Sequence, residues 1–169
     1  PGGWCYQNML RLSQTMQDHS LAAVDPKARR VYPEKSQAGE QAVENMRTGP
    51  YTIYVKLLLP ALTKATLKSA RMQTFVDQTR VACALERYRL AQGRYPEALA
   101  ALVPQFMEAL PLDVIDGQPL RYRLTAPGEP LIYSVGWNKT DDGGKRAWTS
   151  PERSAVKADE GDWVWGPAE

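Results

Sequence analysis

The chain has 169 residues, of which 43% are hydrophobic and 24% are charged, and its formal net charge is +2. Its length suits one domain, and its composition is ordinary for a globular protein. The longest basic run is the pair Arg29-Arg30, so the charge does not favour a nucleic-acid partner. The longest apolar run, 51–62, contains Lys56 and Pro60 and falls short of the about 20 residues that span a bilayer. We therefore expect no nucleic-acid binding and no membrane span within this sequence.

Residues 1–50 are predicted to form helices joined by turns. The first helix is indicated by apolar residues spaced four, three and four apart: Cys5, Met9, Leu12 and Met16. Asp25-Pro26 predicts the start of a second helix, which Pro33 should end. A further apolar stripe from Gly39 to Met46, closed by Gly49-Pro50, indicates a third.

The dominant helix is predicted over residues 63–92. One apolar face comprises Leu67, Ala70, Thr74, Gln78, Val81, Leu85 and Tyr88. A weaker stripe on the opposite side comprises Met72, Val76, Cys83 and Leu90. Because a helix that is apolar on two sides usually lies between two layers, we expect a sheet on one side and the preceding helices on the other. Gly93 is the expected C-cap, and a short helix over 97–103 should follow.

Alternating hydrophobicity then predicts strands over 120–124 and 131–135, joined as a hairpin by the turn-rich segment 125–130. Residues 136–162 should form a long surface loop, and 163–165 a last short strand. The predicted fold class is α+β, with a long helix packed on a small antiparallel sheet and an α-helical N-terminal extension. The predicted division is 1–50 for that extension and 51–169 for the α+β domain.

The two cysteines, Cys5 and Cys83, are too few for a disulfide framework. Since both stand among apolar, helical residues, we expect two buried thiols, with a disulfide between them as the alternative. The sequence has no zinc-type Cys/His spacing, no Walker loop and no nucleophile elbow. Asp113 and Asp116 are an imaginable acid–base pair, but beside Pro111 and Gly117 they are expected to hydrogen-bond their own turn. We therefore predict a protein that is not an enzyme and rank a hydrolase third.

One group of residues has ligand chemistry. Asn138, Thr140 and Asp142 are spaced two apart and are followed by Gly143, like the opening of an acidic calcium loop. Asp141 lies within this run, and further carboxylates follow at Asp159, Glu160 and Asp162. The twelfth position holds Thr149 where an EF-hand needs a bidentate glutamate, so an EF-hand is not predicted. The alternatives are another kind of calcium site and a plain polar loop.

The C-terminal third is rich in tryptophan. These residues are Trp137, Trp148, Trp163 and Trp165. If exposed side by side, they would form an aromatic platform for a glycan or protein partner, since tryptophan is favoured at binding hot spots. Core packing is the alternative fate.

The order of motifs along residues 55–165 resembles a known family. The motifs are Tyr88-Arg-Leu-Ala-Gln-Gly-Arg-Tyr-Pro96, Leu110-Pro-Leu-Asp113, Gly117-Gln-Pro-Leu-Arg-Tyr122, Tyr133-Ser-Val-Gly136 and Asp142-Gly-Gly144. Together they look like the globular half of the major pseudopilins of type II secretion and of related type IV pilin-like proteins of Gram-negative bacteria. Similar modules are expected in envelope proteins of Verrucomicrobia and Planctomycetes.

The resemblance implies a calcium ion in the loop between the last strands. Asp142 and Asp162 are then the best side-chain ligands, with Asn138, Asp141 and carbonyls of 135–138 beside them. In place of the family's membrane-spanning first helix, residues 1–50 are polar. Because the chain also begins at Pro1 without a signal-peptide pattern, we expect a piece of a longer protein, following a membrane anchor.

The function predicted from these observations is structural. We expect an extracytoplasmic module, in the periplasm or cell envelope, that presents a rigid sheet and loop to a protein partner in an envelope or secretion-type assembly. The alternative is a calcium-dependent glycan- or surface-binding module that uses the tryptophan-rich region.

Overall fold

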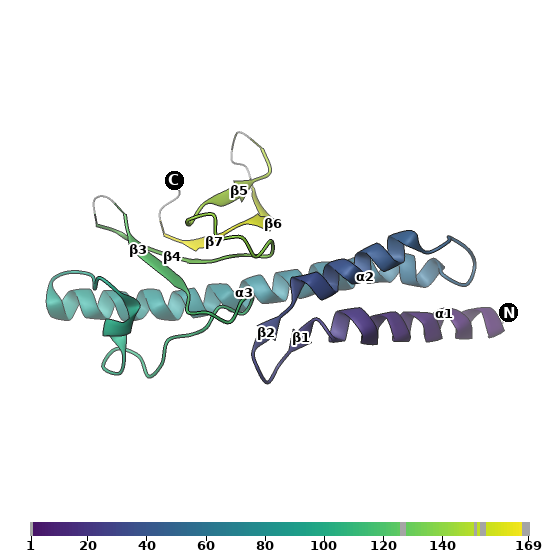
Figure 1. The fold of residues 1–169 in the computed structure, drawn as a ribbon, viewed down its shortest axis with the longest axis horizontal. Coiled ribbons are helices and arrows are strands. Elements are labelled where there is room, and N and C mark those ends of the chain that lie inside the picture. Colours follow the sequence, from purple (N-terminus) through teal and green to yellow (C-terminus); the bar gives the residue numbers. More distant parts are fainter. Residues whose placement is uncertain (1, 126–127, 151, 153–154, 167–169) are drawn as a thin grey trace. The chain divides into compact units, whose positions relative to one another are not determined.

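The computed structural model describes residues 2–125, 128–150, 152 and 155–166 (Figure 1). It contains both helices and small antiparallel sheets, which confirms the α+β class. The chain divides into two compact units, one up to Ser69 and one from Ala70 onward, and the boundary falls within the longest helix. They are called the first and second unit below.

The first unit begins with α1 (Gly2–Thr15), which a π-helical segment, η1 (Met16–Leu21), continues. The predicted helix after Asp25 is wrong: β1 (Val24–Asp25) and β2 (Arg30–Val31) form a hairpin instead. The Asp25 carboxylate accepts hydrogen bonds from the backbone N–H groups of Lys27 and Ala28, at 3.0 Å each, and so closes the turn. Pro33 does not end a helix but begins one, α2 (Pro33–Asn45), where its missing N–H costs nothing.

The core of the first unit is small. Val43, Val55 and Leu59 are its buried residues, and Leu12 and Met16 pack partly against them. The predicted apolar face of α1 is wrong at Met9, which is 64% exposed. The buried Asn8 occupies that face instead, because its amide donates to the Pro50 carbonyl at 2.6 Å and tethers α1 to the chain before the long helix.

The long helix α3 (Ile53–Gln92) begins ten residues before the predicted start and contains Pro60. Proline removes one helical hydrogen bond, but the burial of Val55 and Leu59 in the turns just before it holds the helix in place. At its end Gly93 has a φ of +76° and donates to the Arg89 carbonyl, which confirms the predicted cap.

In the second unit α3 buries one face only. The predicted inner face is confirmed by the buried residues Ala70, Thr74, Gln78, Val81 and Leu85. The prediction that α3 is covered on both sides is wrong, because Met72, Val76 and Leu90 are 61%, 49% and 77% exposed. Cys83 lies on this outer side and is exposed, and Cys5 is half-buried, so the expected pair of buried thiols is also wrong; both are free thiols.

A three-stranded antiparallel sheet packs on the inner face of α3 (Figure 1). Its order is β3 (Arg121–Leu124), β4 (Pro130–Ser134), β7 (Trp163–Trp165), so the predicted hairpin and last strand are confirmed. The 97–103 segment contains the short 3-10 helix η2 (Leu99–Leu102). The main core consists of Val81, Ala84, Leu85, Leu99, Leu102, Phe106, Leu120 and Ile132.

The segment 136–162 is more ordered than the predicted loop. Within it β5 (Arg146–Trp148) and β6 (Val156–Gly161) form a second antiparallel hairpin. Its strands are short and charged: β5 has three residues, and β6 alternates only over Val156-Lys-Ala-Asp159, which is too short a pattern to predict a hairpin by itself.

Candidate functional site

The base of the β5–β6 hairpin is built around Asp162. Its side chain is fully buried, and its backbone N–H donates to the Lys145 carbonyl at 2.9 Å. Its carboxylate Oδ2 accepts from the Gly144 N–H at 2.7 Å. Its other oxygen, Oδ1, is also buried but has no hydrogen-bond partner among the described residues. A buried, half-satisfied carboxylate is costly unless a proton or a cation neutralises it.

Burial is also the main reason why the pKa of Asp162 is raised above that of an ordinary aspartate. The backbone N–H groups of Gly144 and Asp142 oppose this shift, while the charges of Asp141 and Asp142 add to it. The carboxylates of the predicted loop therefore lie close enough to Asp162 for their charges to interact.

Among the predicted ligands, Asn138 and Asp142 lie together. The exposed Asn138 amide donates to Asp142 Oδ2 at 3.4 Å, and its Oδ1 accepts from the Thr140 N–H at 3.1 Å. Asp141 is directed elsewhere: one oxygen accepts from the Gly143 N–H at 2.9 Å, and the other lies 3.8 Å from Arg121 Nε. The structure thus pairs Asn138 with Asp142 and engages Asp141 with Arg121, while the charges of Asp141 and Asp142 both act on Asp162.

These side chains fit the ligand chemistry of calcium, because they offer only oxygen atoms as acceptors. Within the described ranges, no three His, Cys, Asp or Glu side chains are grouped so that they could hold a metal ion. Calcium also accepts amide and carbonyl oxygens, which can complete a site that has fewer carboxylates. Asp162 Oδ1 is the buried oxygen that a cation would satisfy.

The backbone of Gly136 comes very close to the residue that precedes Asp162. Gly136, after β4, has a φ of +67°. A Cβ atom on this residue would collide with the Gly161 carbonyl oxygen. Glycine is therefore required at 136 both for its backbone conformation and for the contact with the residue before Asp162.

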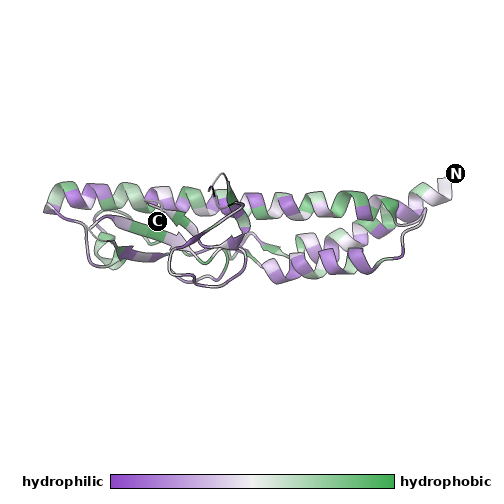
Figure 2. Ribbon diagram, turned by 90° about the horizontal axis from the view of Figure 1, so that it is seen from above, coloured by the Kyte–Doolittle hydropathy of each residue, from purple (hydrophilic) through white to green (hydrophobic). Residues whose placement is uncertain are grey.

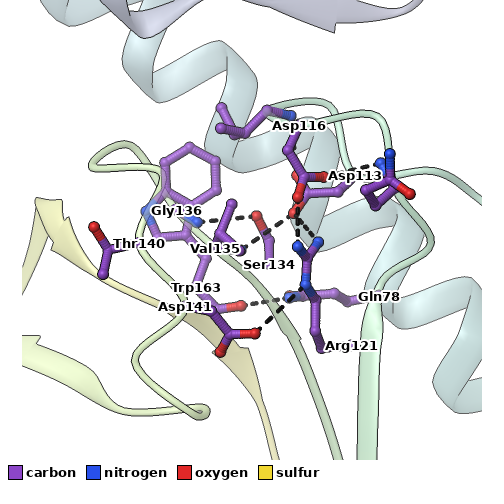
Figure 3. Close-up of polar contacts among 12 residues, drawn as sticks. Gln78, Asp113, Asp116, Arg121, Ser134, Val135, Gly136, Thr140, Asp141 and Trp163 are labelled. Carbon is purple, nitrogen blue, oxygen red and sulfur yellow. Dashed lines mark hydrogen bonds and ion pairs between the residues drawn. The ribbon is translucent and has the colours of Figure 1, made fainter.

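A second polar cluster centres on Arg121 (Figure 3). Its guanidinium points toward Asp113, Asp116 and Asp141, and its Nη1 lies 3.5 Å from Asp113 Oδ2. Asp113 and Asp116 also accept from the backbone N–H groups of Ile115 and Gln118, at 2.9 Å each, which confirms the predicted turn bonds.

Sequence reasoning missed Arg121, because in the strand predicted over 120–124 it alternates with apolar residues and so resembles an ordinary solvent-facing position. A signal was present in the turn that ends at Gly117: it reverses the chain, and Leu112 pairs with Pro119 in antiparallel fashion. This reversal returns the following arginine to the two aspartates. Asp113 is 1% exposed and also accepts from the Val135 N–H at 3.2 Å, so the cluster ties this turn to the end of β4.

The four tryptophans do not form one exposed row. Trp137 and Trp163 are buried, at 5% and 4% exposed, and the Trp163 indole donates to the Ala158 carbonyl at 2.9 Å. Trp148 and Trp165 are half-buried, and the Trp165 ring lies 5.0 Å from that of Phe75. Two of the four rings are therefore unavailable to a partner on the described surface.

None of the helices in the described ranges combines the length and apolar character that crossing a lipid bilayer requires. Comparisons of the chain with protein-family models, with characterised proteins and with solved structures find no significant match. The pseudopilin resemblance therefore depends on the sequence motifs.

Proposed function

We propose that this protein is a non-enzymatic structural module of an extracytoplasmic envelope or secretion-type assembly, with a pseudopilin-like second unit that holds one calcium ion. The motif order supports this proposal, as does the packing of α3 on the antiparallel order β3-β4-β7. The sheet and the segment that joins β4 to β7 would form the surface that binds a partner protein.

The observation that carries the proposal is the buried, unpartnered Oδ1 of Asp162. It lies in the segment between the last two strands of the sheet, where the resemblance places a calcium ion. Its neighbours Asp141 and Asp142 are acidic, and the pKa of Asp162 is raised by its burial and by their charges. A divalent cation would relieve both the unsatisfied oxygen and the repulsion among the carboxylates.

Asp162 and Asp142 are the side chains that would hold the ion, with Asn138 beside them. Bound calcium would supply a positive charge that links the segment after β4 to the start of β7. The chain itself already aligns these segments, through the Gly144 N–H on the Asp162 carboxylate and the Asp162 N–H on the Lys145 carbonyl. The role of the metal would be to stabilise a presented surface, without taking part in a reaction.

Thermal unfolding with and without calcium tests this site. An ion that binds only the native state, with a Kd of about 10 µM, stabilises the protein by about 2.7 kcal/mol at about 1 mM. We expect the midpoint to rise from EDTA to calcium in the natural chain, and this rise to be lost in Asp162→Asn. The asparagine retains an oxygen for the Gly144 N–H but lacks the negative charge.

The matched control is Asp159→Asn, which removes the same charge from an exposed residue of β6. It should keep the full calcium-dependent rise. If the natural chain shows no rise, or if all three proteins rise equally, Asp162 does not bind calcium and the proposal loses its main support.

A further inference from the structure

The outer side of α3 in the second unit carries an aligned row of exposed apolar residues, here called the outer stripe. It consists of Met72, Phe75, Val76, Cys83 and Leu90. Four of them are spaced by four, seven and seven residues, which keeps them on one side of a helix in a heptad-like pattern. Figure 2 shows apolar positions recurring along α3 between polar ones.

This exposure is more than scattered surface hydrophobicity. Phe75 is 50% exposed and Val76 is 49% exposed, and they lie about one turn from Met72. Val76 is on the side opposite the buried Val81 and Leu85, whereas Phe75 lies at the edge of that side and contacts Trp165 of β7. Single exposed apolar residues are common, but Met72, Phe75 and Val76 are grouped within about one turn, and Cys83 and Leu90 follow on the same side with Thr79 and Glu86 between them. Knob positions at heptad spacing suit the apolar face of a second helix.

The charges along the outer stripe are mainly basic. The exposed arginines Arg80 and Arg87 lie on one margin and the half-buried Arg71 on the other. Arg87 donates to the Phe106 carbonyl, which leaves its charge uncompensated, whereas Arg80 pairs with Asp77 at 3.3 Å. From Ala70 to Gln92, α3 has four arginines and two acidic residues, and those two acidic residues pair with Arg80 and Arg89.

Arg71 adds to this excess of positive charge. In the described part of the chain it has no acidic partner, and the pKa of Arg146 is lowered first by burial and then by the charge of Arg71. Arg146 donates to the carbonyls of Val164 and Gly166, at 3.0 Å each, and these carry no formal charge. Arg146 is therefore held against β7, whose Trp165 ring contacts Phe75.

We propose that the outer stripe docks an amphipathic helix of a partner protein whose apolar seam is flanked by aspartate or glutamate. The apolar row supplies contact area, and the arginines at its margins select acidic flanks. A second copy of this chain is a poor occupant, because two outer stripes would bring like charges together. This surface lies on the side of α3 that the sheet does not cover, so the inference goes beyond the proposed function and adds a second docking surface.

The test uses the full chain and two synthetic helical peptides of about 21 residues, identical in their leucine seam. One peptide has glutamate at the flanking positions and the other has lysine. We expect the glutamate peptide to bind at least about tenfold more tightly in fluorescence anisotropy, and to lose affinity between about 0.05 M and 0.5 M salt. Val76→Asn should weaken it by about tenfold or more, and Arg71→Gln should reduce the preference for glutamate.

The matched control is Leu112→Asn, which changes another exposed leucine of the second unit and should bind as the natural chain does. Melting curves of each variant show whether it is folded. Equal binding of the two peptides, or no effect of Val76→Asn, would overturn the inference. Dimerisation of the chain in sedimentation, with Cys83 protected from a thiol reagent, would instead assign the stripe to a second copy. The calcium melts depend on neither result, so each proposal can fail separately.

Discussion

Two buried aspartates of the second unit show how differently a folded chain can accommodate a carboxylate. Asp113 accepts backbone hydrogen bonds at both oxygens and has Arg121 within 3.5 Å. Asp162 accepts at Oδ2, and its Oδ1 has no hydrogen-bond partner among described residues. In both, burial is the largest influence and raises the pKa. Only Asp162 has an oxygen left to bind something that the chain does not supply.

At the same scale, Gly136 should be far less replaceable than Gly143. Both have φ near +70°, but a Cβ at 136 would strike the Gly161 carbonyl, whereas a Cβ at 143 would meet nothing within 4 Å. Gly143→Ala should therefore cost only the left-handed backbone penalty, about 1 kcal/mol. Gly136→Ala should cost about 3 kcal/mol or more, since it adds a clash with backbone. Denaturant unfolding measures both, and equal costs would contradict the close approach.

Among the elements, α3 is the one whose two faces have different environments. Val81 and Leu85 are fully buried against the sheet side, while Cys83, between them in sequence, is exposed. The face that a side chain occupies, and not its hydrophobicity, should decide the effect of truncation.

We expect Leu85→Ala to destabilise the protein by about 2–5 kcal/mol, because it removes buried methyl groups and leaves a cavity. Cys83→Ala, the control on the outer side, should change the free energy of unfolding by no more than about 0.5 kcal/mol. Chemical denaturation of both variants gives the comparison. A large loss at Cys83 would mean that the outer stripe is covered in the free chain.

The elements that sequence predicted well have strong local signals. The inner face of α3, the Gly93 cap and the β3–β4 hairpin follow from helical period, cap chemistry and alternation. The β1–β2 hairpin did not, because Asp25-Pro26 is compatible with both a helix start and a turn, and the Asp25 hydrogen bonds decide between them.

The site was predictable in its residue types and less so in its geometry. Asn138, Asp142 and Asp162 were identified from their oxygen chemistry and a resemblance, but nothing local shows that Asp162 is buried. The pairing of Asp141 with Arg121 depends on a chain reversal about 20 residues earlier. Burial of Trp137 and Trp163 likewise depends on the hairpin that alternation could not reveal.

For the whole molecule, the two units have cores of unequal size. The first has three buried hydrophobic residues in its cluster, and the second has eight. Because local stability follows the apolar area that unfolding exposes, the first unit should open more readily.

Hydrogen exchange should show this difference within a single helix. We expect backbone amides of α3 from Ala70 to Gln92 to exchange more slowly than those from Ile53 to Ser69, after correction for intrinsic rates. Val55→Ala, in the smaller core, should speed exchange in the first unit further. Uniform protection along α3 would show that the two units unfold together.

The base of the β5–β6 hairpin has one more consequence. The chain leaves at Lys145 and returns at Asp162, and these residues are joined by a 2.9 Å hydrogen bond. A chain segment whose two ends are held together can change in length at little entropic cost, since doubling the length of a loop raises the free energy of closing it by only about 0.6 kcal/mol. The connection between Trp148 and Val156, where β5 ends and β6 begins, is thus a natural position for insertion: a foreign sequence placed there would leave the bonds of Arg146 and Ala158 to β7, and with them the sheet, in place.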